Sequence, residues 1–257
     1  MSMDSTTTSI DRPPKTSGRF DISEKKLTPA TDLAAKRRPM VKGESEAYAQ
    51  ARQQLLAEEI RVRRHIEALA EQRRALPPGP VIEKDYRFID PTGNEVGLAD
   101  LFGGKDVLLT YFWMYGPERA RPCPMCTNLL GPLDANAADL EQRVAVAVFG
   151  RSPVERQFAF RSERGWRNLK FYQTVGDDYA LDFGGLDTSN GWEYPVLALF
   201  QKGQDGAVRL FWMGEMSGEM ADPGQDPRGS VDPAPLWTML DLTPEGRGTD
   251  WYPKLEY

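Results

Sequence analysis

The sequence predicts an α/β protein whose central mixed sheet is flanked by helices, with an N-terminal hairpin and a long N-terminal amphipathic helix. Three observations support this. Residues 144–149 form an unbroken apolar run, which is typical of a strand buried on both faces of a sheet. A second apolar run, residues 107–114, is joined to it through a helix-like segment, so these two strands should be parallel. Two further strand pairs are separated by short turn segments, which predicts antiparallel hairpins.

The totals exclude several classes of function. The chain has 257 residues, a net charge of -6 and 40% apolar residues, which suits a globular protein and argues against nucleic acid as a partner. The first residues lack the apolar core of a signal peptide, and no apolar run is long enough to cross a bilayer. We therefore expect a cytoplasmic protein with no membrane partner. The single histidine, His65, excludes a multi-histidine metal centre.

The N-terminal third divides into two segments. Residues 1–40 are rich in Ser, Thr, Pro and Lys, so a disordered tail is expected there, with a docking arm for a partner as the alternative. Residues 41–76 form the second segment, and residues 44–75 contain no Gly or Pro. Apolar side chains recur every seven residues at Tyr48, Leu55, Val62 and Leu69, which predicts one long amphipathic helix. This helix lies along its own domain or forms a homodimer through residues 44–75.

The proline-rich segment 76–80 ends this helix and marks a domain boundary. A globular domain is expected over residues 81–246, followed by a C-terminal tail over 247–257. The predicted elements begin with a hairpin over 85–98, a helical turn over 98–104 and the strand 107–114. A helix follows the cysteines to residue 142, kinked at Gly131-Pro132, and leads into the strand 144–149.

The second half of this domain continues the alternation. Ser152 is expected to cap a helix that begins at Pro153 and stops at Gly165. A strand over 169–174 and a helical turn over 177–182 come next. The strands 194–200 and 208–213 should form a second hairpin. After a loop over 214–230, Asp232 is expected to cap a final helix, residues 233–242.

Cys123 and Cys126 are the only cysteines, and the two residues between them let both sulfurs sit on the first turn of one helix. Such a pair can form a disulfide or share a metal, and in a reducing compartment it is more often catalytic, redox-sensing or metal-binding than structural. The helix dipole would favour a thiolate at Cys123. Arg119 and Arg121 could add to this stabilisation, while Glu118 opposes it.

The order of elements resembles the thioredoxin-like fold, and the leading hairpin is similar to that of the branch containing peroxiredoxins and membrane-tethered thiol reductases. More closely, the chain over residues 40–246 resembles a bacterial family of thioredoxin-like proteins of unestablished function. The similarity rests on the long N-terminal helix and on the motifs at 83–86, 115–117, 122–126, 164–166 and 240–244. It implies that Cys123 is the attacking thiolate and Cys126 the resolving thiol. It also places a cis-proline at Pro195, facing the cysteines, and a helix kink at Pro132.

This resemblance implies a thiol–disulfide oxidoreductase that needs no cofactor and no metal. Its partners would be a protein or small-molecule disulfide and a thiol reductant. The residues predicted to bind substrate are Tyr194, Pro195, Trp113 and Arg121. Three alternatives stay open: an inert interaction protein on the same scaffold, a thiol peroxidase, and a metal-binding module. One Cys-x-x-C pair alone is a weak signal for zinc.

Overall fold

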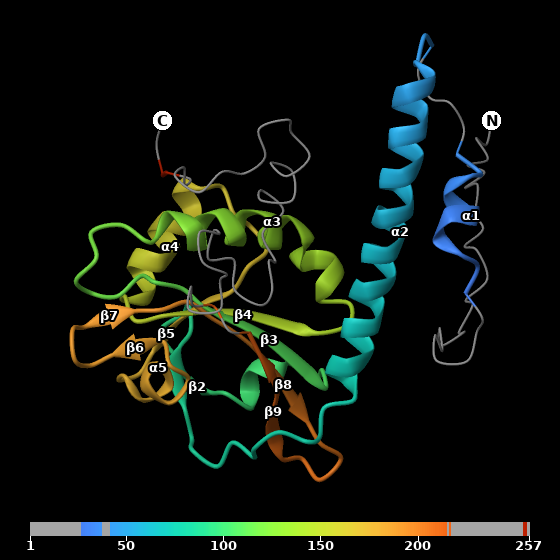
Figure 1. Cartoon of the computed structure of the whole chain (residues 1–257). Coiled ribbons are helices and arrows are strands. Elements are labelled where there is room, and N and C mark those ends of the chain that lie inside the picture. Colours follow the sequence, from blue (N-terminus) through green and yellow to red (C-terminus); the bar gives the residue numbers. More distant parts are fainter. Residues whose placement is uncertain (1–26, 38–41, 215, 217–253, 256–257) are drawn as a thin grey trace, which may run out of the picture. The chain divides into compact units, whose positions relative to one another are not determined.

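A computed structural model describes residues 27–37, 42–214, 216 and 254–255. The chain separates into two units, Met1–Ala75 and Leu76–Tyr257 (Figure 1). Within the described residues, no helix is both long and apolar enough to cross a membrane.

The first unit is a helical pair formed by α1 (Ala30–Ala34) and α2 (Glu46–Arg74). The hydroxyl of Ser45 caps α2 by accepting a hydrogen bond from the backbone N–H of Tyr48 at 3.2 Å. Ala30 and Ala34 pack on Ala57 and Ile60 of α2. The expectation of disorder through residue 40 is therefore wrong for α1, whose small side chains find an apolar partner on α2.

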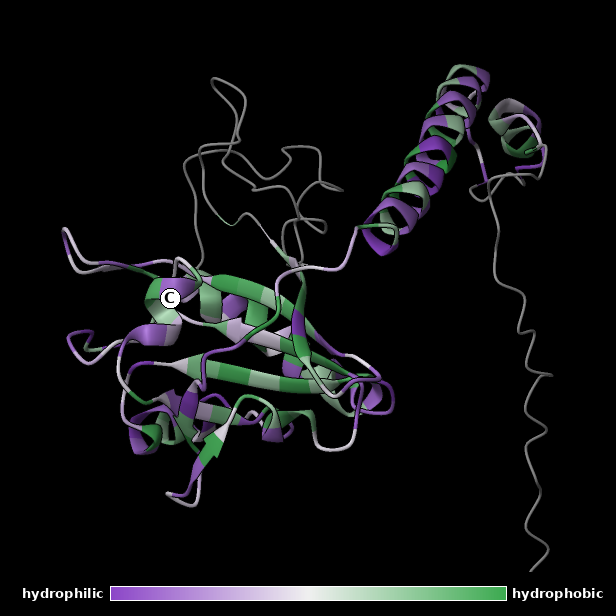
Figure 2. Ribbon diagram, turned by 90° about the horizontal axis from the view of Figure 1, so that it is seen from below, coloured by the Kyte–Doolittle hydropathy of each residue, from purple (hydrophilic) through white to green (hydrophobic). Residues whose placement is uncertain are grey.

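The face of α2 predicted from the seven-residue spacing does not meet α1. Tyr48, Leu55, Val62 and Leu69 are all exposed. In Figure 2, hydrophobic residues alternate with hydrophilic residues along the ribbon of α2.

The second unit is built on one seven-stranded sheet with the strand order β2-β1-β5-β4-β3-β8-β9. The parallel pairs are β3 with β4 and β4 with β5, and the other pairs are antiparallel. The predicted mixed sheet is therefore confirmed. Its strands are β1 (Arg87–Ile89), β2 (Glu95–Gly97), β3 (Val107–Phe112), β4 (Ala145–Gly150), β5 (Phe171–Thr174), β8 (Val196–Lys202) and β9 (Val208–Met213).

Helices cover both faces of this sheet (Figure 1). One face carries α3 (Pro124–Leu140) and α4 (Val154–Glu163), whose buried side chains join the core cluster that contains Trp113 and Cys126. The other face carries the 3₁₀ turn η1 (Asp100–Phe102) and α5 (Asp178–Asp182). There an aromatic cluster forms, in which the rings of Phe88 and Phe149 stack at 4.2 Å between centroids.

The order of elements follows the sequence prediction, with three differences. Strand β3 ends at Phe112 instead of residue 114, because Trp113 and Met114 turn into the loop before the cysteines. Ser152 does not cap α4; it is fully buried, and its hydroxyl donates to the Gly116 carbonyl at 3.1 Å. A small hairpin of β6 (Leu186–Asp187) and β7 (Trp192–Glu193) was not predicted. The predicted final helix, residues 233–242, lies outside the described residues.

Candidate active site

The cysteine pair lies where β3 gives way to α3. Cys123 is the N-cap residue of α3, with φ -60° and ψ 129°, and Pro124 occupies the first helical turn. The Cys123 N–H donates to the Met114 carbonyl at 3.0 Å, which ties this helix start to the end of the β3 segment. Because the first amides of a helix have no intrahelical partner, the Cys123 sulfur lies beside unpaired N–H groups.

The two thiols are reduced and occupy different environments. Cys126 is 1% exposed and belongs to the apolar core, whereas Cys123 is only partly buried. A single turn of helix therefore joins a sulfur that a substrate can reach to one that it cannot.

This difference is also seen in their acidity. A hydrogen bond from the Cys126 thiol, the backbone N–H groups of Cys126 and Met125, and the charge of Arg119 together lower the pKa of Cys123 to about 6, against the effect of burial. Burial, followed by the neighbouring Cys123 sulfur, raises the pKa of Cys126 well above its usual range. These opposite shifts in pKa favour the thiolate form at Cys123 over that at Cys126.

Tyr111 is a site residue that the sequence analysis missed. This β3 residue is 2% exposed, and its hydroxyl hydrogen-bonds the buried Cys126 thiol. Burial and the two cysteine sulfurs raise the pKa of Tyr111, so its hydroxyl stays protonated and able to donate. The only sequence signal was its position three residues before the end of the apolar run 107–114, on the face toward α3.

The loop before Cys123 is held by a buried carboxylate from β7. Glu193 is 4% exposed and accepts a hydrogen bond from the Gly116 N–H at 2.9 Å. It also pairs with Arg119 at 3.3 Å and with Arg151 at 3.4 Å. A Cβ on Gly116 would clash with the Glu193 carboxylate, so only glycine allows this approach.

A second set of contacts fixes the same loop from the α4 side. The Ser152 N–H donates to the Tyr115 carbonyl at 2.9 Å. Arg156 donates to the Pro117 carbonyl at 3.1 Å, and its guanidinium lies 5.0 Å from the centroid of the Tyr115 ring. The loop is therefore hydrogen-bonded both to β7 and to the α4 side, and these contacts fix the positions of Arg119 and Cys123.

Two of the predicted substrate-binding residues, Trp113 and Arg121, have partners of their own in the second unit. Trp113 is 0% exposed, and its indole N–H donates to Gln157 at 3.1 Å, so it is a core residue and the prediction that it binds substrate is wrong. Arg121 pairs with Glu163 of α4, and its guanidinium lies 4.9 Å from the Phe160 ring centroid. The arginine whose charge acts on Cys123 is Arg119 instead.

The other two predicted residues lie at the start of β8. Tyr194 is 39% exposed, and its N–H donates to the Gly185 carbonyl at 3.0 Å. Pro195 precedes Val196, which pairs with Phe112 at the end of β3. The peptide bonds of the described residues include no cis bond, so the expected cis-proline at Pro195 is wrong. Strand β8 pairs with β3 in antiparallel orientation while the Tyr194–Pro195 peptide bond is trans.

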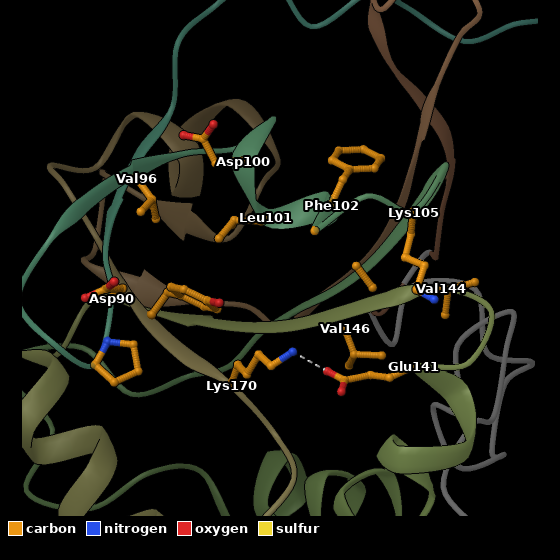
Figure 3. Close-up of a pocket in the computed structure, with 14 residues that line it drawn as sticks. Asp90, Val96, Asp100, Leu101, Phe102, Lys105, Glu141, Val144, Val146 and Lys170 are labelled. Atoms are coloured by element: carbon orange, nitrogen blue, oxygen red, sulfur yellow. Dashed lines mark hydrogen bonds and ion pairs between the residues drawn. The ribbon is translucent and has the colours of Figure 1, made fainter.

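One pocket of the second unit lies away from the cysteines. Figure 3 shows a pocket of about 480 Å³ that Phe102, Val146, Lys105, Lys170 and Glu141 help to line. It lies where β3 and β4 begin, whereas the cysteines follow the end of β3. Lys170 and Glu141 already pair with each other at 2.7 Å.

Among the described residues, no group of three or more His, Cys, Asp or Glu side chains comes together as a metal site would need. The cysteine pair therefore has no evident third ligand in this part of the chain.

The chain matches one family profile and is similar to several solved structures at low identity. The profile of a family described as "Bacterial protein of unknown function (DUF899)" matches residues 36–257. No curated protein matches the chain. Among solved structures, the exposed lipoprotein thioredoxin of Streptococcus pneumoniae is 18% identical, with 62% of this chain and 100% of that chain covered and a TM-score of 0.37. Peroxidoxin BcpB of Mycobacterium tuberculosis is 19% identical, covering 52% and 82%, with a TM-score of 0.36. A peroxiredoxin-like protein of Aquifex aeolicus is 15% identical, covering 54% and 75%, with a TM-score of 0.38.

Proposed function

The chain belongs to this bacterial family of unknown function, and we propose that it is a thiol–disulfide oxidoreductase in which Cys123 attacks and Cys126 resolves. The observation that supports this most is the asymmetry of the pair. The accessible sulfur has a pKa of about 6, so about 90% of it is thiolate at pH 7. The second sulfur stays buried and protonated in the resting state.

The first step is an exchange at sulfur. The Cys123 thiolate attacks a substrate disulfide, whose S–S bond breaks as a Cys123–substrate S–S bond forms. The first substrate sulfur leaves as a thiolate. Half-burial of Cys123 leaves room for this approach, while the backbone N–H groups of Met125 and Cys126 hold the attacking charge beforehand.

The second step needs the Cys126 thiolate, and the first step favours its formation. The hydrogen bond and the charge of the Cys123 thiolate both raise the pKa of Cys126. Once Cys123 is in a disulfide, that charge has gone. The Tyr111 hydroxyl and the Met114 N–H then act on a thiolate that has no anionic neighbour, which lowers its pKa.

The Cys126 thiol gives up its proton to solvent, and the resulting thiolate attacks the Cys123 sulfur. The bond between Cys123 and the substrate breaks, the Cys123–Cys126 bond forms, and the second substrate sulfur leaves as a thiolate. Two electrons have moved from the protein to the substrate, and the protein holds a Cys123–Cys126 disulfide. A thiol reductant returns the pair to the dithiol state. The substrate class in this proposal is a protein or small-molecule disulfide in a reducing compartment, with no cofactor.

Trapping tests the order of attack. With a disulfide reagent, a Cys126→Ser variant is expected to accumulate a mixed disulfide on Cys123, detected as a mass increase. A Cys123→Ser variant should stay unmodified under the same conditions, because the remaining thiol is buried. Equal trapping by both variants would remove the assignment of roles. A Cys123 that reacts like an ordinary thiol would instead favour an inert interaction protein on this scaffold.

A further inference from the structure

We propose that Arg119 recognises a carboxylate on the substrate, with the ring of Trp192 as the adjoining apolar face, so that the preferred substrates are small disulfides bearing a carboxylate near the sulfur. This inference rests on the proposed function, because it concerns what Cys123 attacks.

Arg119 keeps donors for a further acceptor. It lies in the anchored loop four residues before Cys123, and its side chain is 29% exposed. In the described part of the chain, the carboxylate that meets it does so through Nε, at 3.3 Å from Glu193 Oε2. Among the described residues, no hydrogen bond from its two terminal nitrogens is seen, and a planar guanidinium matches a carboxylate in geometry.

The positive charge of Arg119 is only partly compensated by neighbouring carboxylates among the described residues. Glu193 is shared between Arg119 and Arg151, and Arg151 has a second carboxylate partner, Asp177, at 2.7 Å. Compensation is thus more complete at Arg151 than at Arg119. The residual positive charge is felt at the reacting sulfur, since it stabilises the Cys123 thiolate.

The exposed ring of Trp192 lies next to the Arg119 guanidinium and adds an apolar surface to it. The strand β7 alternates, so Glu193 points inward at 4% exposure while Trp192 points outward at 53% exposure. The Arg119 guanidinium lies 5.5 Å from the centroid of the Trp192 ring. A large aromatic ring exposed beside a partly free cation offers an apolar contact and a carboxylate contact together.

Two chromogenic reagents separate charge recognition from thiol reactivity. The disulfide 5,5′-dithiobis(2-nitrobenzoate) carries a carboxylate on each ring, and 4,4′-dithiodipyridine is neutral at pH 7.5. Initial second-order rate constants are measured for both with the intact reduced protein at low ionic strength. The fraction of Cys123 thiolate enters both rates equally, so the ratio of the anionic to the neutral rate is insensitive to a change in the pKa of Cys123.

The expected result is a fall in this ratio for Arg119→Gln of about fivefold, as expected for the loss of one solvent-exposed ion pair. Arg119→Lys should retain part of the ratio. The matched control is Arg87→Gln, a half-buried arginine on β1 that pairs with Glu95, which should leave the ratio unchanged. The inference is overturned if Arg119→Gln leaves the ratio of the anionic to the neutral rate unchanged. It is also overturned if Arg121→Gln lowers this ratio as much as Arg119→Gln does.

Failure of this inference and failure of the proposed function have different signatures. If 4,4′-dithiodipyridine reacts rapidly and the ratio is the same in Arg119→Gln, only the recognition role is lost. If the wild-type protein reacts with the neutral reagent no faster than an ordinary free thiol, the proposed function is lost as well.

Discussion

Replacing Cys126 changes the reactivity of Cys123 in a way that depends on one hydrogen bond. The largest cause of the low pKa of Cys123 is the bond donated by the Cys126 thiol. A hydrogen bond to a charged group contributes about 1.5–3 kcal/mol, which corresponds to about one to two pKa units. A Cys126→Ala variant, which has no donor there, should therefore raise the pKa of Cys123 from about 6 to about 7–8.

The assay is the rate of alkylation by iodoacetamide as a function of pH, with the modified residue identified by mass. For the wild-type protein the rate should rise tenfold per pH unit below the pKa and level off above it, because only the thiolate is alkylated. Buried, protonated Cys126 does not contribute in this range. The matched variant is Cys126→Ser, whose hydroxyl keeps a donor and should hold the pKa of Cys123 near the wild-type value.

The comparison of the two variants decides the outcome. If Cys126→Ala leaves the pKa of Cys123 near 6, the helix amides and Arg119 stabilise the thiolate without the neighbouring thiol. If Ser and Ala raise it equally, the effect comes from the altered packing of the buried site. Either result refutes the reasoning.

Three further predictions concern the surroundings of the pair. A Tyr111→Phe variant should release its mixed disulfide about tenfold more slowly, because Cys126 loses a donor to its thiolate, while the first step measured by stopped flow stays unchanged. A Gly116→Ala variant should lower the free energy of unfolding by about 2–4 kcal/mol in a denaturant titration, since its Cβ would displace the Glu193 carboxylate; unchanged stability would contradict the buried contact. If residues 44–75 pair two copies of the chain, light scattering will give a dimer mass that falls on dilution, whereas a monomer at all concentrations excludes this role.

The position of the cysteine pair between β3 and α3 was predictable because its sequence signals are local. An apolar run, a proline directly after the first cysteine and a helix-like segment are enough to place Cys123 at the start of α3. The hairpins were predictable for the same reason, since turn residues such as those around Gly93 separate two short strands.

The rest of the site could not be read locally because it depends on contacts distant in sequence. Glu193 lies 77 residues after Gly116, its hydrogen-bond partner, and only the folded chain shows that the carboxylate is buried. Trp113 and Trp192 are the same residue type, yet one is fully buried and the other 53% exposed, according to the position of each in its strand or loop. The missed hairpin β6–β7 consists of two-residue strands, too short to give an alternating pattern.

The long loop before Cys123 has a physical reason in this network. A buried carboxylate is costly unless it is paired, and Glu193 is paired by Arg119, by Arg151 and by the N–H of Gly116. Two of these three partners belong to the loop. A shorter connection from β3 to α3 would leave Glu193 without them, and Cys123 without the cation of Arg119. The loop length, the glycine at position 116 and the acidity of Cys123 are therefore linked through one carboxylate on β7. A Glu193→Gln variant should consequently alter both the stability of the protein and the alkylation profile of Cys123, whereas an exposed carboxylate such as Glu95, substituted in the same way, should alter neither by much.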